Sequence, residues 1–286
     1  MSKIVCPVTY IACRAIQSYI IPFTGNYVLT AAGAQGGAGA SPGGRGARVE
    51  GLFYFRQGEI LEIIVGMQGG AGWQRAFAPD HTACGGGGGG ATWIWKTAAA
   101  NSRPTWPLLV AGGGGGGGHE TGGAGWANEE PAESDAAGLT SLAVTYPCRH
   151  FGGGAGASWN YPGGPGPGPI FCHGGTHWEG GAGIGYGEMC GGDGGYGGGG
   201  GGGFLGYAAG GGAGFAGGQG GGQTEGKISR VIRSGGGSSY NSGRYACNIT
   251  GGQPGNGHAM ITALAPSIVL QARPEGVPIV FPKGVT

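Results

Sequence analysis

The densest group of carboxylates in the sequence lies in the stretch NEEPAESD, at positions 128–135. It contains Glu129, Glu130, Glu133 and Asp135. Paired carboxylates can carry out general acid–base chemistry or bind Ca²⁺. A proline breaks this stretch and its neighbours are polar or small, which is typical of a solvated loop. We therefore interpret this stretch as a solvated loop. None of the six histidines forms an evident pair with a nucleophile in the sequence, so we predict that the protein is not an enzyme and has no catalytic residues.

Soft and imidazole ligands occur close together only around Cys172, His173 and His177. They lie in a loop rich in Gly and Trp, with no fourth ligand nearby in the sequence. The chain has seven cysteines but no CxxC pair, so zinc-ribbon and thioredoxin-type sites are not supported. We therefore predict no metal.

Two glycine motifs resemble nucleotide-binding loops. Residues 33–39 (GAQGGAG) approach the dinucleotide fingerprint, but Ser-Pro-Gly-Gly follows and no helix is predicted to hold the pyrophosphate. Residues 221–227 fit the start of a P-loop, yet Ile228 stands where a Ser or Thr hydroxyl should meet Mg²⁺. We expect no cofactor.

Large aromatic and imidazole side chains recur in the Gly/Pro loops of the second half. Rings on loops carried by a rigid frame are typical of a recognition surface. They could equally fill gaps beside glycine segments, which have no side chains of their own. Both interpretations stay open for Trp126, Trp159, Tyr161, His173, His177 and Trp178.

The elements that must position these residues have an unusual composition. Gly and Pro account for 78 and 17 of the 286 residues, about a third, against a usual share of roughly 12%. Aromatic residues make up 9% and the net charge is +1, which argues against disorder, and the glycines lack the period of collagen. The balanced charge favours neither nucleic acid nor anionic membrane as a partner, and the short apolar runs predict no membrane insertion.

The sequence divides into a glycine-rich body, residues 23–264, between two differently composed segments. Residues 1–22 are apolar, and we read them as an assembly strand or a weak signal peptide. Residues 265–286 contain four prolines and short β-branched runs. Alternating or β-branched runs predict strands at residues 26–31, 47–55, 59–65, 91–96, 106–111 and 258–264.

Runs of glycine separate these strands, at residues 85–90, 112–118 and 197–203, with shorter runs at 210–212 and 220–222. Such runs stay ordered only if their backbone groups bond to neighbouring chains. Polyglycine II helices, which share the threefold geometry of polyproline II, satisfy each other in this way. Because the runs adjoin strands directly and contain little Ser, we expect an ordered bundle instead of flexible linkers.

The order of several motifs resembles the glycine-rich extracellular domain of the anaplastic lymphoma and leukocyte tyrosine kinase receptors, and similar glycine-rich proteins of bacteria and protists. The motifs are FTGNYVL (23–29), GAQGG (33–37), IIVGMQG (63–69), GGGGGGAT (85–92), LLVAG (108–112) and GNGHAMI (255–261). The resemblance implies a mainly β fold, a jelly-roll-like (TNF-like) β-sandwich with an inserted bundle of polyglycine II helices. It also implies a disulfide between Cys172 and Cys190. Polyglycine phage tail-fibre adhesins are similar to a lesser degree.

The leading functional hypothesis is a non-enzymatic structural subunit of an extracellular fibre, filament or virion appendage, which assembles with copies of itself. The rigid body, apolar segments and low charge favour it. The alternative is a recognition module, either a tail-fibre adhesin or a secreted ligand-binding domain. Its partner would be a cell-surface protein or glycan bound through the loop aromatics.

Overall fold

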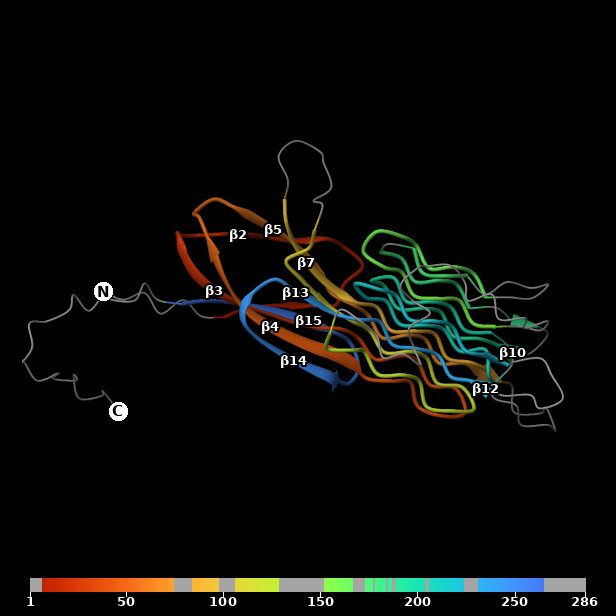
Figure 1. Ribbon diagram of the computed structural model, residues 1–286. Coiled ribbons are helices and arrows are strands. Elements are labelled where there is room, and N and C mark those ends of the chain that lie inside the picture. The colour runs from red at the N-terminus through yellow and green to blue at the C-terminus, as the bar shows by residue number, and fades with distance from the viewer. Residues whose placement is uncertain are drawn as a thin grey trace, which may run out of the picture.

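The computed structural model describes residues 7–74, 84–97, 106–128, 152–166, 173–176, 178–183, 185–186, 189–203, 206–223 and 231–264. In these residues the protein is all-β, its sheets are antiparallel, and they contain no helix. A pair of five-stranded sheets forms a sandwich at one end, and long glycine-rich segments run side by side from it toward the other end (Figure 1).

The first large sheet, sheet A, has the strand order β1-β15-β3-β4-β14. Its strands are β1 (Val8–Ile11), β15 (His258–Ala263), β3 (Gly25–Ala32), β4 (Gly46–Phe55) and β14 (Arg244–Gln253). In the register, Leu29 lies opposite both Ile261 and Gly51. The alternate residues Tyr27, Leu29 and Ala31 are fully buried, as period-2 patterning predicts for one face of a strand.

The second large sheet, sheet B, has the order β13-β8-β7-β5-β2. Its strands are β13 (Tyr240–Asn241), β8 (Leu109–Ala111), β7 (Thr92–Lys96), β5 (Ile60–Ile64) and β2 (Gln17–Ile20). Short ladders lie in the glycine-rich part. They join β6 (Trp73–Gln74), β10 (Met189–Cys190) and β9 (Gly185–Tyr186), and separately β11 (Gly222–Gln223) and β12 (Val231–Ile232).

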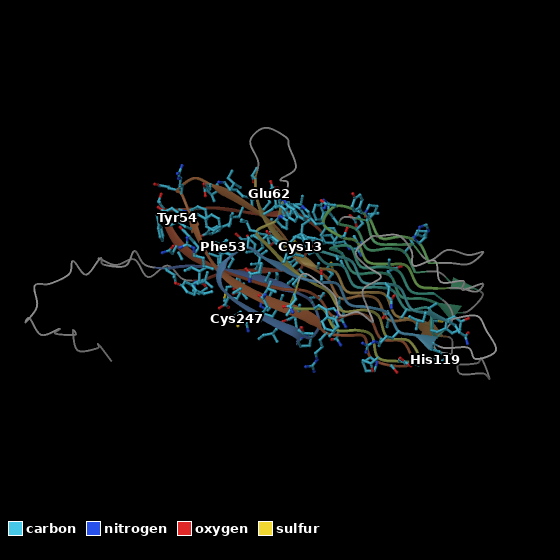
Figure 2. All side chains as sticks on the ribbon, in the orientation of Figure 1. Cys13, Phe53, Tyr54, Glu62, His119 and Cys247 are labelled. Carbon is cyan, nitrogen blue, oxygen red and sulfur yellow. The ribbon has the colours of Figure 1, made fainter. Side chains whose placement is uncertain are left out.

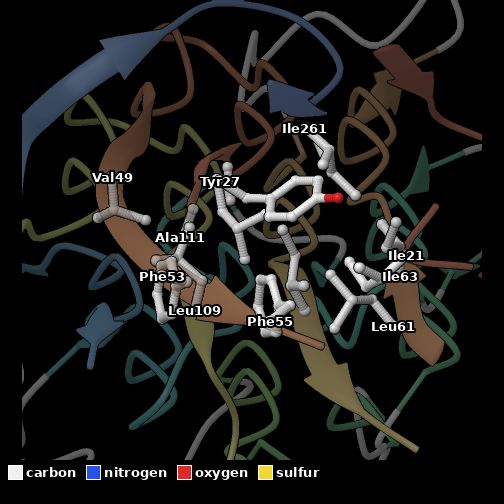
Figure 3. Close-up of a cluster of buried hydrophobic side chains, with 14 of the residues drawn as sticks. Ile21, Tyr27, Val49, Phe53, Phe55, Leu61, Ile63, Leu109, Ala111 and Ile261 are labelled. Carbon is white, nitrogen blue, oxygen red and sulfur yellow. The ribbon is translucent and has the colours of Figure 1, made fainter. Parts of the chain in front are cut away.

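One hydrophobic core fills the space between the two large sheets (Figure 3). Each sheet contributes one face to it, with Tyr27, Val49 and Ile261 from sheet A and Leu61, Ile63 and Leu109 from sheet B among its members. Burying a large apolar side chain stabilises a fold by about 1.5–3 kcal/mol, so this core holds the sandwich together.

Sheet B is apolar on its outer face as well. The register aligns Ile64 with Trp93 and Trp93 with Val110, and all three are fully buried in a second cluster. Strands that are buried on both faces have nearly continuous apolar sequences, which accounts for EILEIIV and ATWIW. A cover must therefore lie on this face of sheet B.

The glycine segments bond through their backbones with a period of three residues. In the run 85–90, residues that are three apart donate to the same neighbouring segment, at 2.7–3.0 Å. The acceptors for residues 85 to 90, in order, are the carbonyls of Gly203, Gly117, Gly70, Gly200, Gly114 and Met67. Their own carbonyls accept from three other segments, in order from Gly192, Gly210, Gly37, Gly195, Ala213 and Ala34. This run thus lies inside a ring of six segments with every backbone polar group paired.

Most of the predicted strands are present: β3, β4, β5, β7 and β15 lie within or across the expected ranges. β8 is shorter than the expected strand at 106–111. Residues 8–20, expected in an N-terminal segment, contribute β1 to sheet A and β2 to sheet B. Residues 265–286 lie outside the described part of the chain.

Candidate functional site

Two of the predicted site residues belong to a compact group of rings that we call the tryptophan cluster. Trp159 and Trp178 come from glycine-rich loops, and Trp93 and Trp95 come from the outer face of β7. Trp95 stacks on Trp178 with ring centroids 5.4 Å apart, and Trp93 lies 5.8 Å from both Trp159 and Trp178. Trp159 is only 2% exposed.

The tryptophan cluster covers sheet B and attaches the glycine segments to it. The indole Nε1 of Trp93 donates to the carbonyl of Gly197, and the amide of Gly197 donates to the carbonyl of Trp178. Offset and edge-to-face ring pairs add about 0.5–1.5 kcal/mol beyond their area burial. Trp159 and Trp178 therefore fill a gap between glycine segments and sheet, which was one of the two interpretations of the sequence.

Of the other predicted residues, Trp126, Tyr161 and His173 are described, and none of the three belongs to the tryptophan cluster. Tyr161 is 60% exposed, His173 is exposed and Trp126 is half-buried. The indole nitrogen of Trp126 has no hydrogen-bond partner among the described residues. Cys172, His177 and the acidic stretch 129–135 lie outside the described residues, and Cys190 is described only by its backbone in β10.

A second aromatic group escaped the sequence analysis. Trp106, Phe215 and Tyr240 stack in nearly parallel planes, with centroid separations of 4.7 Å for Phe215 and Tyr240 and 5.7 Å for Trp106 and Phe215. Trp106 is 57% exposed. The sequence analysis assigned Trp106 only to a predicted strand. The ring partners of Trp106 are more than a hundred residues away along the chain, so no local pattern could identify this stack.

A pocket of about 170 Å³ lies where the connection between β1 and β2 meets the glycine segments. We call it the junction pocket. The charged side chains in its lining come from three separate parts of the chain. Its lining residues are Arg14, Glu179, Gly180, Gly181, Ala182, Asp193, Gly194 and Tyr196.

Local hydrogen bonds fix the walls of the junction pocket. Glu179 ends a tight turn in which its amide donates to the hydroxyl oxygen of Thr176 and its carbonyl accepts from the Thr176 amide. The Asp193 Oδ1 accepts from the amide of Gly183 at 2.7 Å. The amide of Gly194 donates to the Gly181 carbonyl at 2.8 Å. The two acidic walls are therefore bonded to each other through glycine backbone.

Tyr196 joins this pocket to the tryptophan cluster. The residue is 6% exposed and packs in the same buried cluster as Trp93 and Trp159. Burial raises the pKa of its hydroxyl, and the charge of Glu179 raises that pKa further. The hydroxyl is thus neutral at physiological pH.

Charges of both signs line the junction pocket without meeting. No ion pair joins Arg14 to Glu179 or Asp193 in the part of the chain that the structure describes. Within that part, no three His, Cys, Asp or Glu side chains are grouped as metal ligands would be. The three charged side chains of the lining, Arg14, Glu179 and Asp193, are exposed to solvent, and the described lining offers no nucleophile paired with a base.

The sequence matches no protein-family model and no curated protein. Among the described residues there is no helix of the length and apolarity needed to cross a bilayer.

Proposed function

We propose that the protein is a non-enzymatic structural subunit of an extracellular fibre, filament or virion appendage, and that it assembles with copies of itself. The observation that carries this proposal is the ring of six hydrogen-bonded segments around residues 85–90. An interior made of mutually bonded backbone has no side chains that can change rotamer, so it suits a part whose task is to keep its shape.

The glycine segments are, in this proposal, polyglycine II helices inserted into a jelly-roll-like (TNF-like) sandwich. The period of three supports the first assignment, because such a helix has three residues per turn. The run 112–118 has the same period: Gly113 and Gly116 donate to the segment 210–213, and Gly114 and Gly117 donate to the segment 34–37. The division of the chain between two five-stranded antiparallel sheets supports the assignment of a jelly-roll-like sandwich.

The distribution of side chains also fits a structural subunit with a rigid backbone interior. Figure 2 shows them crowded on the sandwich and sparse along the glycine segments, toward the end that carries His119. The sandwich also exposes apolar side chains, among them Ile11 at 71% and Ile20 at 64% on the strands β1 and β2. Exposed apolar side chains of this size can take part in contacts between copies.

The test is to purify the full chain and to follow its association by sedimentation and electron microscopy as concentration rises. We expect regular oligomers or filaments, and weaker association for a variant that combines Ile11→Lys with Ile20→Lys. The matched control is Glu62→Lys, a new lysine at a half-buried polar position of β5. A chain that stays monomeric at high concentration would exclude self-assembly.

A second candidate function is a recognition module, and the stack of Trp106 on Phe215 and Tyr240 favours it. A large ring held flat by two others is pre-organised to contact a partner such as a cell-surface protein or glycan. Trp106→Ala and Tyr161→Ala should then abolish attachment to cells or glycan arrays and leave the melting temperature nearly unchanged. Attachment that survives both changes would remove this candidate.

A further inference from the structure

The outer face of sheet A exposes large apolar side chains to solvent, whereas the tryptophan cluster covers the outer face of sheet B. Along β1, β3, β4 and β15 the outward residues are those that alternate with the core residues Tyr27, Val49 and Ile261. Tyr54 is 64% exposed and Ile249 on β14 is 47% exposed. The large apolar side chains of this face belong to Ile11, Val28, Leu52, Tyr54, Ile249 and Met260.

We propose that the outer face of sheet A packs against the same face of a second copy of the chain, in a contact with twofold symmetry. This inference rests on the self-assembly proposed above and names one of its contacts. An antiparallel sheet with one free face usually presents polar residues there. A broad apolar face instead indicates a surface that is covered by a partner.

The register shows that this face is level and closely packed. One row of outward residues crosses all five strands in the order Ile11, His258, Ala32, Arg48, Ile249. In the next row Thr30 lies between Met260 and Glu50. Thr30 and Ala32 point outward, yet both are fully buried, because the side chains on either side close over them. A second sheet can therefore lie flat on this surface.

The charges of the face select a second copy as the occupant. Arg48 and Glu50 are the only residues with a fixed charge at the outward positions of β1, β3, β4 and β15, and β14 adds Arg244 at the rim. Arg48 Nη2 lies 3.6 Å from Glu50 Oε2, and the two side chains are 45% and 38% exposed. A copy turned by 180° about an axis through this pair places each Arg48 against the Glu50 of the other copy. The pair is thus self-complementary, as a twofold contact requires.

The size of the face is also sufficient. Five strands lie side by side in sheet A, and the longest have ten residues. At a spacing of about 4.8 Å and a rise of about 3.3 Å per residue, the face measures up to about 24 Å by about 33 Å. A standard specific interface buries about 800 Å² per partner. Two sheets that face each other pack about 10 Å apart with their side chains between them.

The experiment reverses one charge at a time in the full chain and follows association by sedimentation. In Arg48→Glu every cross-contact of the pair becomes acid against acid, and in Glu50→Arg it becomes base against base. Each variant alone should associate at least about tenfold more weakly than the wild type, because like charges are then juxtaposed. A one-to-one mixture of the two variants should recover association as a mixed pair, since all cross-contacts are again of opposite sign.

Two control variants change charge outside sheet A. Arg14→Glu lies in the exposed connection between β1 and β2, and Glu62→Lys lies on β5 of sheet B; both should associate as the wild type does. Thermal melts verify folding. Glu50 accepts a hydrogen bond from the buried Thr30 hydroxyl, so Glu50→Arg can lower stability. Arg48→Glu changes an exposed side chain and tests the contact by itself.

The outcomes separate this contact from the structural function. Oligomers or filaments that persist unchanged in Arg48→Glu would overturn the contact and leave self-assembly standing. Wild-type pairs that never extend, and that Arg48→Glu dissociates, would support the contact and count against a fibre. A mixture that associates no better than either variant alone would overturn the twofold arrangement, and a wild type that stays monomeric at high concentration would overturn both proposals.

Discussion

The indole Nε1 of Trp93 donates a 3.1 Å hydrogen bond to the carbonyl oxygen of Gly197. Trp93 lies on the outer face of sheet B, and Gly197 belongs to the glycine segments. The bond is buried, so it joins the two parts of the protein where water cannot compete with it. The sandwich and the glycine segments are consequently expected to unfold together.

Replacement of Trp159 by Ala tests this coupling. The ring is 2% exposed and lies between Trp93, Trp95 and Trp178. Its removal opens a cavity at the junction, and we expect a loss of about 3–5 kcal/mol in the free energy of unfolding. Chemical denaturation measures it, with Tyr161→Ala as the control, which should change that free energy by no more than about 0.5 kcal/mol. Equal effects at the two positions would contradict the buried role of Trp159.

The glycine segments predict that a single methyl group is highly destabilising. A Cβ on Gly88 would overlap the carbonyl oxygen of Gly211, so Gly88→Ala forces two hydrogen-bonded segments apart. We expect a loss of several kcal/mol from overpacking and broken buried hydrogen bonds, read from a thermal melt.

Gly25→Ala is the matched control for Gly88→Ala. There a Cβ would be 3.7 Å from the ring of Phe23, an ordinary contact, so the melting temperature should be unchanged or slightly higher. Gly115→Val is a further test, because its Cβ would lie 2.6 Å from Ser234 Oγ and 2.8 Å from the Gly235 carbonyl. If the glycine segments were flexible linkers, none of the three substitutions would lower the melting temperature.

Thr92 bonds the two sheets of the sandwich at the start of β7. Its hydroxyl donates to the Ala32 carbonyl of β3 at 2.6 Å and accepts from the Gly66 amide at 3.0 Å, and it is fully buried. Thr92→Val keeps the shape but leaves both partners unpaired. We expect a cost of about 1–3 kcal/mol, against little change for Thr97→Val at an exposed position.

His258 makes the stability depend on pH. Burial lowers the pKa of its imidazole below 6.5, and the nearby charge of Arg48 lowers it further. The unfolded chain therefore binds the proton more readily than the folded chain does. The stability that the neutral imidazole of His258 contributes is fully present above pH 6.5. It is lost as the pH falls through 6.5 toward the pKa of the folded state. Denaturation between pH 5 and pH 7.5 should show this loss, and His258→Asn should flatten the profile in that window.

The alternation of apolar residues was sufficient to predict the core strands, because Tyr27, Leu29 and Ala31 face one interior. It missed β14, whose ten residues include none that is buried. That strand is held by its backbone ladder to β4, so its side chains carry no periodic signal.

The candidate site was less predictable than the fold. Trp159 and Trp178 were identified as residues of interest, but their partners on β7 were assigned only to a strand. The junction pocket combines Arg14 with Glu179, Asp193 and Tyr196, and no local pattern links positions so far apart. Their proximity follows from the return of the glycine segments over sheet B.

The ring of six segments around residues 85–90 also has a calorimetric consequence. Heat capacity rises on unfolding when apolar surface becomes hydrated, and it falls when peptide groups do. Melting a bundle that is almost entirely peptide backbone exposes little apolar surface. The protein should therefore have a heat-capacity increment per residue below the usual value of about 12–15 cal/mol/K. Its stability curve would be correspondingly flat, so that the protein keeps its shape over a wide range of temperature.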